Sequence, residues 1–374
     1  MVDLEYPAGD GARRLCLNMI VKDEEHVIGR CLASALPFID SWAIVDTGST
    51  DRTMQIIREV LGHLPGELHQ RPWKDFATNR NEALALAKKW ATHTLVMDAD
   101  SELVAEPGFA LPEMTADGYY ATHRMARADT SFKRIKILSN RRPWRYVGAV
   151  HEVLVCDEAQ ALETLSGITC LEHSDSARNK VGARTKYMRD AELIERILRV
   201  VPDDRRHVFY LAQSLRDAGE TARAIDAYRR RVALGGWDEE VWYAQYQVGA
   251  LHLLREEEAA GTHALLAAHA MRPSRAEALH ALAVHARRRK DWALAYMFAR
   301  NAAEIPYPDR DLLFISESIY RWRALDELSI AAYYVERFEE SRAAARTLLA
   351  SSFLPADQRD RVAATLGFAE AKLT

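Results

Sequence analysis

The pattern of the sequence changes near residue 180. Before that point, short apolar runs alternate with segments whose apolar residues recur at helical spacing, and after it almost every segment has the helical pattern. Strands and helices that alternate at this spacing require crossover connections, and therefore a mostly parallel sheet. With 374 residues, the chain is long enough for two domains with separate cores. We therefore expect an α/β domain followed by an all-α domain.

The first part of the chain is expected to form strands joined by helices. Asp51 or Thr50 is the expected N-cap of the second helix. The segment between residues 119 and 171 changes to strand-like runs, which predicts an antiparallel addition to the sheet. The predicted strands cover residues 15–21, 42–45, 67–70, 94–97, 119–124, 132–138, 146–155 and 165–171, and the predicted helices cover residues 27–36, 52–61 and 79–90.

The second part of the chain repeats itself. Small residues recur as pairs twelve positions apart, and the pairs start 37, 34 and 46 residues apart, close to the 34-residue period of tetratricopeptide repeats. Small side chains at such sites let paired helices approach closely, although a generic helical bundle is the alternative. The predicted domains are 13–178 (α/β), 179–204 (a connecting helix) and 205–374 (helical repeats). The pairs are Ala212 and Ala224, Gly249 and Gly261, Ala283 and Ala295, and Ser329 and Ser341.

Two carboxylates stand directly after a predicted strand. Asp98 and Asp100 follow the apolar run 94–97, which places them just past the carboxyl edge of the sheet. Ligands of open α/β sheets bind at that edge. An Asp-x-Asp run in an arbitrary loop is more often a solvated turn, but two carboxylates placed here can hold a hard divalent cation, which in turn neutralises a diphosphate.

Polar residues also follow the first and second strands. Asp46 ends the second strand, where its carboxylate can accept hydrogen bonds from a ribose or a base, and Gly48 permits a tight turn after it. The polar run 18–25 extends past the end of the first strand. Three strand ends are therefore expected to meet in one polar crevice.

Taken together, these motifs resemble a family 2 glycosyltransferase with the GT-A fold. The runs Ile-Val-Lys-Asp-Glu-Glu (20–25), Val-Asp-Thr-Gly-Ser-Thr-Asp (45–51), Arg-Asn (80–81) and Met-Asp-Ala-Asp (97–100) occur in the family's order. The run Gly-Ala-Val-His-Glu (148–152) and the later His173 continue the match, so the resemblance covers about residues 13–175. With tetratricopeptide-like repeats following, the architecture is also similar to that of sublancin-type S-glycosyltransferases.

The resemblance implies a metal-dependent, inverting transfer of a sugar from a nucleotide sugar, with a UDP-hexose as the expected donor. Glu152 matches the family's acidic base, although in a strand one of residues 151 and 152 points to solvent. Asp98, Asp100 and His173 are the implied ligands of Mg²⁺ or Mn²⁺, with His151 as the alternative to His173. The implied nucleotide-sugar-binding residues are Ile20, Val21, Lys22, Glu24, Asp46, Arg80, Asn81, Asp98, Ala99 and Asp100.

A peptide or protein acceptor is the favoured expectation, because stacked helix pairs expose a concave face suited to an extended peptide. The same surface could instead form a homodimer. Two other functions stay open, namely a glycosyltransferase of a lipid-linked or lipopolysaccharide glycan and a non-catalytic scaffold with a nucleotide-sugar-binding domain. A nucleotidyltransferase is disfavoured, because residues 22–25 contain no glycine.

Charge and composition exclude other classes. The net charge of -4 disfavours a nucleic-acid binder. No apolar run is long enough for a membrane span, and the first six residues lack the basic and apolar regions of a signal peptide. The four cysteines form no Cys-x-x-Cys pair, which argues against a disulfide framework or a structural zinc site. A cytoplasmic protein is therefore expected.

Overall fold

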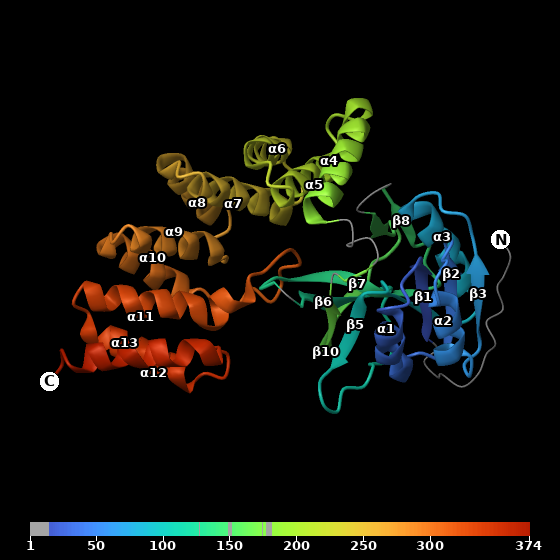
Figure 1. The fold of residues 1–374 in the computed structure, drawn as a ribbon, viewed down its shortest axis with the longest axis horizontal. Helices are drawn as coiled ribbons and strands as arrows, with labels where there is room; N and C mark the ends of the chain where they lie inside the picture. The colour runs from blue at the N-terminus through green and yellow to red at the C-terminus, as the bar shows by residue number, and fades with distance from the viewer. Residues whose placement is uncertain (1–14, 127, 149–151, 174, 177–181) are drawn as a thin grey trace. The chain divides into compact units, whose positions relative to one another are not determined.

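A computed structural model describes residues 15–126, 128–148, 152–173, 175–176 and 182–374 (Figure 1). The chain divides into two compact units. The first comprises Met1–Ala128 and Phe132–Lys186, and the second comprises Asp129–Ser131 and Tyr187–Thr374. The boundary lies near the start of helix α4 (Ala183–Val200), in the region where a connecting helix is predicted.

The first unit is built on one mixed sheet, in which eight strands lie in the order β3-β2-β1-β4-β7-β6-β10-β5. The pairs β1–β2, β1–β4 and β2–β3 are parallel, as the alternation of strand and helix predicts. The strands of this sheet are β1 (Leu15–Val21), β2 (Ser41–Asp46), β3 (Gly66–Gln70), β4 (His93–Val96), β5 (Ser101–Ala105), β6 (Gly118–Met125), β7 (Ser131–Ser139) and β10 (Leu162–Glu172), and the helices are α1 (Ile28–Ala35), α2 (Thr53–Leu61) and α3 (Phe76–Ala87).

Helices cover both faces of the parallel part of the sheet (Figure 1). Leu17 and Met19 of β1 share one core with Leu32 of α1 and Ile57 of α2. The alternate residue Cys16 lies in a second core with residues of α3. Because β1 is buried on both faces, its sequence is nearly continuously apolar, which is typical of a central parallel strand. This arrangement confirms the predicted α/β fold class.

The register places three strand ends at one edge of the sheet. Val21, the last residue of β1, pairs with Asp46, the last residue of β2. On the other side of β1, Asn18 pairs with Val96 at the end of β4, and the Met97 N–H donates to the Asn18 carbonyl. Asp46 and Asp98 therefore lie at or just after the ends of the two strands that flank β1, at the same edge of the sheet.

The second half of this unit differs from its prediction in two ways. Residues 146–155 do not form one strand, because the chain reverses into a separate two-stranded sheet of β8 (Arg145–Val147) and β9 (Val153–Val155). Gly148 follows β8 with a φ of +108°, which an extended strand cannot adopt. The added strands are also not all antiparallel, because β10 pairs parallel with β6 and antiparallel with β5.

Two helix starts are also corrected. Helix α3 begins at Phe76 rather than at residue 79, because the Asp75 carboxylate accepts the Thr78 N–H and caps the helix. Helix α2 follows Arg52 as its N-cap residue, which makes no side-chain capping bond. The predicted cap, Asp51, still accepts the Thr53 N–H at 2.9 Å.

The second unit consists of successive helix pairs, and the small residues lie where the paired helices touch. A Cβ atom on Gly249 would meet Leu265 Cγ at 2.6 Å, and one on Gly261 would meet Leu253 Cδ2 at 2.5 Å. The Ser341 hydroxyl donates to a carbonyl of the partner helix at 2.7 Å. The helices are α5 (Arg205–Asp217), α6 (Thr221–Leu234), α7 (Asp238–Leu254), α8 (Glu258–Met271), α9 (Glu277–Arg288), α10 (Trp292–Glu304), α11 (Ala324–Tyr334), α12 (Phe338–Ala350) and α13 (Arg359–Glu370).

The long 46-residue spacing has a structural cause. A non-helical segment, residues 311–316, lies between α10 and α11 and is held by buried charges of the preceding repeats. Arg275 donates to the carbonyls of Leu313 and Phe314, at 3.2 and 2.7 Å, while Glu239 accepts the backbone N–H groups of Leu312 and Leu313. Arg275 is fully buried. This segment is therefore a fixed part of the helical unit.

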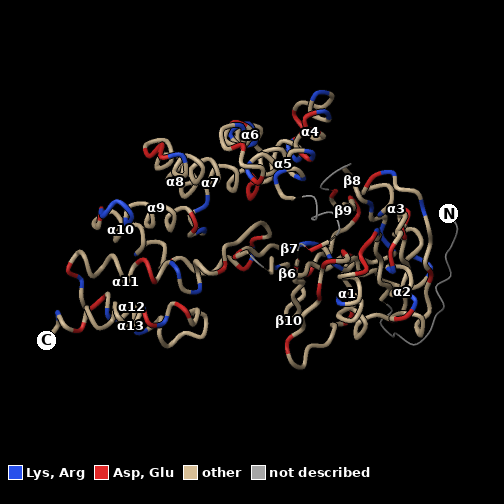
Figure 2. The backbone as a smooth tube through the Cα atoms, viewed as in Figure 1, with Lys and Arg blue, Asp and Glu red and all other residues tan. Residues whose placement is uncertain are grey.

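None of the described helices is long and apolar enough to cross a membrane. Figure 2 shows Lys and Arg interspersed with Asp and Glu along both units. Both units therefore carry positive and negative side chains, in keeping with the small net charge of the chain.

Candidate active site

Asp46 is the buried carboxylate at the end of β2. Its Oδ1 atom accepts the N–H groups of Gly48 and Ser49, at 3.0 Å each, and Gly48 has a φ of +112° that a side chain would disfavour. Its Oδ2 atom is buried and has no hydrogen-bond partner among the described residues. A buried carboxylate oxygen without a partner is costly, so this atom indicates a ligand that donates a hydrogen bond.

The polar run after β1 is tied to the loop after β2. Asp23 accepts the Thr50 N–H at 2.7 Å, and the Glu24 N–H donates to the Thr53 hydroxyl at 2.7 Å. Asp23 has a φ of +53°. Lys22 is exposed, whereas Ile20 and Val21 belong to β1. Much of the predicted run 20–25 therefore builds the wall beside Asp46.

Asp98 follows β4 and forms an ion pair with Arg80 of α3. The distance between Asp98 Oδ1 and Arg80 Nη2 is 2.5 Å. Burial alone would raise the pKa of the Asp98 carboxyl, but the charges of Arg80 and of the buried Lys136 hold that pKa well below its usual range. Asp98 is therefore ionised, and the protein already supplies it with a counter-charge.

Asp100 has the opposite electrostatic environment. Burial raises its pKa, and the neighbouring carboxylates Asp98 and Glu172 raise it further, while the Ser176 hydroxyl donates a hydrogen bond to it. Within the described residues, no ion pair neutralises Asp100. A divalent cation would supply this missing positive charge, and Asp100 with its neighbour Asp98 offers the oxygen ligands that Mg²⁺ and Mn²⁺ prefer.

Two of the three predicted metal ligands already pair with other side chains. His173 Nε2 lies 2.7 Å from Glu102 Oε2, so this ring is paired with a different carboxylate. Asp98 is held by Arg80, as described above. His151 lies outside the described residues. The assignment of Asp98, Asp100 and a histidine as ligands stays a prediction.

A buried cluster that the sequence motifs did not indicate lies on the neighbouring strands. It consists of His123, Cys170 and Glu172, whose donor atoms all lie within 4.8 Å of one another, together with Lys136. Burial would raise the pKa of Glu172, but its hydrogen bond with His123 and the charge of Lys136 lower it to about 2. Burial lowers the pKa of His123 to about 4, and Lys136 contributes to this shift.

This cluster is balanced internally. Burial alone would lower the pKa of Lys136, but the negative charges of Glu172 and Asp98 raise it, so Lys136 stays charged. Burial raises the pKa of the Cys170 thiol to about 11, so this thiol is protonated at neutral pH. The lysine supplies the positive charge that a metal would otherwise bring. The sequence feature that could have indicated this cluster is a lysine and a histidine within strands that alternate apolar and polar residues.

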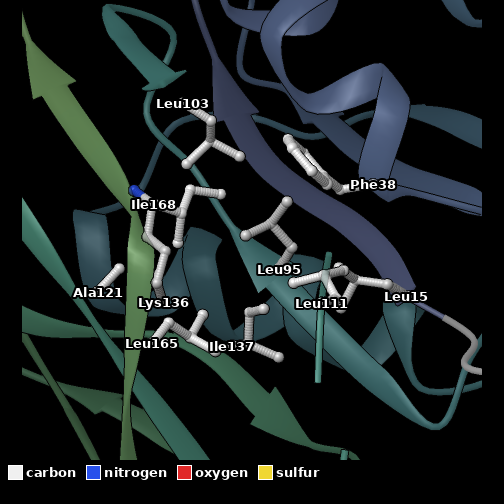
Figure 3. Close-up of a pocket in the computed structure, with 10 residues that line it drawn as sticks. All are labelled: Leu15, Phe38, Leu95, Leu103, Leu111, Ala121, Lys136, Ile137, Leu165 and Ile168. Atoms are coloured by element: carbon white, nitrogen blue, oxygen red, sulfur yellow. The ribbon is translucent and has the colours of Figure 1, made fainter. Parts of the chain in front are cut away.

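Two cavities in the described part of this unit are not lined by Asp46, Asp98 or Asp100. Figure 3 shows a cavity of about 10 Å³, lined mostly by aliphatic side chains such as Leu95, Leu103 and Ile168, along which the Lys136 side chain extends. A second cavity of about 320 Å³ is lined by residues at the amino ends of β1 and β4, including Leu15 and His93. That is the edge of the sheet opposite to Asp46.

Glu152 directly precedes β9 and is brought to α3 by the β8–β9 hairpin. Its Oε1 atom lies 2.7 Å from Arg80 Nε. The neighbouring Asn81 fixes the same hairpin, because its side-chain amide donates to the Tyr146 carbonyl at 2.9 Å and accepts the Tyr146 N–H at 2.8 Å. Both polar atoms of the Asn81 side chain are thus engaged by backbone. The structure gives Arg80 and Asn81 a part in holding Glu152, beside their predicted part in donor binding.

Comparison with known proteins identifies the fold of this unit. Residues 16–114 match the family described as Glycosyl transferase family 2. The N-terminal unit carries a family 2 glycosyltransferase domain. The matched residues include Asp46, Arg80, Asp98 and Asp100 but end before Glu152. The assignment of Glu152 as the candidate base therefore rests on its position in the structure and on the resemblance of its motif.

Among curated proteins, TPR repeat-containing protein Synpcc7942_0270 of Synechococcus elongatus (strain ATCC 33912 / PCC 7942 / FACHB-805) is similar to this chain. The two are 33% identical over 162 residues, which is 41% of this chain and 38% of that protein. The chain thus spans well under half the length of this relative. The packed helix pairs of α5–α12 give the second unit its tetratricopeptide-like architecture.

Two solved structures illustrate the structural similarity of this chain to other proteins. BtubC (BKLC) from P. vanneervenii has 12% sequence identity and a TM-score of 0.38, covering 53% of this chain and 85% of that chain. MamA 41-end from Desulfovibrio magneticus RS-1 has 15% identity and a TM-score of 0.33, covering 50% of this chain and 97% of that chain.

Proposed function

We propose that this protein is an inverting glycosyltransferase that moves a hexose from a UDP-sugar to a peptide or protein acceptor, with Mg²⁺ or Mn²⁺ as its cofactor. The observation that carries the proposal is the unpartnered Oδ2 atom of Asp46, at the same sheet edge as Asp98 and Asp100 in a family 2 domain. A uracil N–H or a ribose hydroxyl is the donor that this oxygen lacks.

The paired carboxylates suit the other end of the donor. Asp100 and Asp98 would hold the cation, which when bound stabilises the charge that develops on the departing nucleoside diphosphate. The raised pKa of Asp100 supports this role, since a nearby cation favours the ionised carboxylate. Asp98 is already ionised at neutral pH because of Arg80.

Glu152 is the proposed general base. An inverting transfer needs a carboxylate that removes the acceptor's proton as the acceptor attacks the anomeric carbon. The Glu152 side chain is largely buried and accepts a hydrogen bond from Arg80 Nε at 2.7 Å. Asp98 and Asp100 face the donor's phosphates in this scheme and are not available to the acceptor.

The proposal of a peptide or protein acceptor is based on the helix pairs of the second unit. Stacked helix pairs offer a long surface on which an extended peptide can lie. The segment 311–316 already lies along part of it, packed by Phe314 against Phe209 and Tyr243. An acceptor peptide would therefore use the part of the helical surface that this segment leaves open.

The donor proposal is tested by calorimetry with UDP and a panel of UDP-hexoses, with and without Mn²⁺. Asp46→Asn should weaken UDP binding at least tenfold, because the substituted amide presents an N–H where the ligand also presents one. The matched control is Asp40→Asn, since Asp40 binds the Leu15 N–H at the opposite sheet edge and should leave UDP binding unchanged.

Absence of metal-dependent binding by every member of the panel would refute the proposed function. Binding of UDP-sugars without any hydrolysis of them would instead support a non-catalytic scaffold.

A further inference from the structure

The Arg80 guanidinium joins two carboxylates that serve opposite reactants in the proposed function. Its Nη2 atom lies 2.5 Å from Asp98 Oδ1, on the donor side, and its Nε atom lies 2.7 Å from Glu152 Oε1, on the acceptor side. Asp98 is 18 residues away in sequence and Glu152 is 72 residues away. The fold therefore brings two carboxylates together around one planar cation.

The guanidinium has little room for a further ligand. Its side chain is only 14% exposed. The Tyr146 ring covers it, with a distance of 5.3 Å between Arg80 Cζ and the ring centroid. An arginine that binds phosphate presents free N–H groups to its ligand. In Arg80, two edges of the guanidinium already donate to carboxylates.

The helix that carries Arg80 is fixed on both sides of it. Asn79 is buried, accepts the Lys74 N–H at 2.9 Å and donates to the Pro72 carbonyl at 3.2 Å, which holds the loop before α3. Asn81 holds the backbone of Tyr146 on β8. Three consecutive side chains thus fix the loop, the carboxylate of Glu152 and the hairpin that carries Glu152.

We propose that Arg80 is a positioning residue for the base, which holds the Glu152 carboxylate in place for the acceptor and ties it to Asp98, and that it is not a ligand of the donor's phosphates. This inference rests on the proposed function. Lysine cannot take over the role, because one ammonium does not present two N–H edges to two carboxylates at fixed angles.

Two reactions that need no peptide or protein acceptor distinguish a positioning residue from a phosphate ligand. In hydrolysis of a UDP-hexose, the anomeric C–O bond to the diphosphate breaks as a C–O bond to water forms, and the water proton passes to Glu152. Azide is already an anion, so it forms a glycosyl azide without giving up a proton. Loss of the base, or of its position, should therefore spare azide turnover, whereas loss of a phosphate ligand should not.

The experiment compares Arg80→Lys, Glu152→Gln and the double variant, each with UDP, a UDP-hexose, Mn²⁺ and azide. We expect Arg80→Lys to lower hydrolysis about 10- to 100-fold, as expected for a misplaced catalytic group. Its Kd for UDP should stay within about threefold and its azide turnover should persist. In the Glu152→Gln background the same change should cost less than about twofold, because the group it positions is gone.

Two further variants complete the test. Arg142→Lys makes the same substitution at an arginine that binds Asp117 away from this site, and it should leave all three measurements unchanged. Asn81→Ala loosens the hairpin without touching Arg80, so it should also lower hydrolysis and spare azide turnover. If Arg80→Lys does not fold, Asn81→Ala still tests the inference.

The outcomes are distinct. If Arg80→Lys weakens UDP binding more than tenfold and abolishes azide turnover, Arg80 is a phosphate ligand and this inference is overturned, while the proposed function stands. If the wild-type chain neither binds UDP nor hydrolyses a UDP-hexose, the proposed function fails and the inference fails with it.

Discussion

At the scale of the residue, the carboxylates of this site differ in what they still lack. Asp98 and Glu152 share Arg80, and Glu172 is paired with His123. One oxygen of Asp46 has no partner in the part of the chain that the structure describes. Burial and, after it, the neighbouring carboxylates Asp98 and Glu172 raise the pKa of Asp100. The two incompletely satisfied groups are therefore the two that the proposal assigns to the base or ribose and to the cation.

The His123–Glu172 pair predicts how stability depends on pH. Burial lowers the pKa of His123 to about 4 from an ordinary 6.5, so between these values the unfolded chain binds a proton that the folded chain does not. Stability should therefore fall as the pH drops from 6.5 to 4, by about 2–3 kcal/mol for this group. His123→Gln should show a flatter fall of the unfolding temperature over this window.

The exposed His63→Gln is the matched control and should keep the wild-type slope. Equal slopes for wild type and His123→Gln would contradict the role given to the buried ring.

At the scale of the element, close approach explains the repeat pattern better than helix propensity does. Gly249 and Gly261 stand inside α7 and α8, where glycine weakens a helix by about 1 kcal/mol relative to alanine. Their positions against Leu265 and Leu253 leave no space for a Cβ atom. The glycines are therefore set by packing between the paired helices.

Gly249→Ala should destabilise the chain by about 1–3 kcal/mol, because its Cβ would meet both the side chain and the backbone nitrogen of Leu265, at 2.6 and 2.9 Å. Gly367→Ala in α13 is the matched control, since nothing lies within 4 Å of that Cβ position. It should leave stability unchanged or raise it by about 1 kcal/mol. Chemical denaturation of both variants measures the difference, and equal effects would refute the packing argument.

At the scale of the whole molecule, the two units have separate cores and separate proposed tasks. The first carries the carboxylates of the proposed chemistry. The second contains a segment, 311–316, that is fixed by the buried Arg275, whose partners Glu277 and Asp311 are themselves buried. Removing one member of such a buried ionic network is usually costly, so this segment is expected to stay in place rather than to move aside.

Deleting residues 205–374 tests the division of labour. If the helical unit presents the acceptor, the truncated protein should still hydrolyse a UDP-hexose at a rate within about threefold of the full chain, while transfer to a peptide or protein acceptor falls at least tenfold. Circular dichroism of the truncated protein is the control for folding. Unchanged transfer by the truncated protein would show that the helices only support the first unit.

The sequence by itself determined the elements and the edge at which the site lies. Strands β1 to β4, the position of Asp46 and Asp98 at strand ends, and the pairs of small residues all follow from local periodicity and spacing, because each depends on neighbours a few positions away. The predicted strand over residues 146–155 was wrong, because Gly148 has a φ of +108° and residues on either side of it pair as the antiparallel strands β8 and β9.

Only the tertiary structure decided which charges meet. Arg80 pairs with Glu152 across 72 positions, and His123 pairs with Glu172 across 49. The segment 311–316 is held by Arg275, which lies just before α9, the first helix of the preceding pair. Such contacts follow from strand order and helix packing, and a buried charge takes the partner that the fold brings to it, whatever motif it belongs to in the sequence.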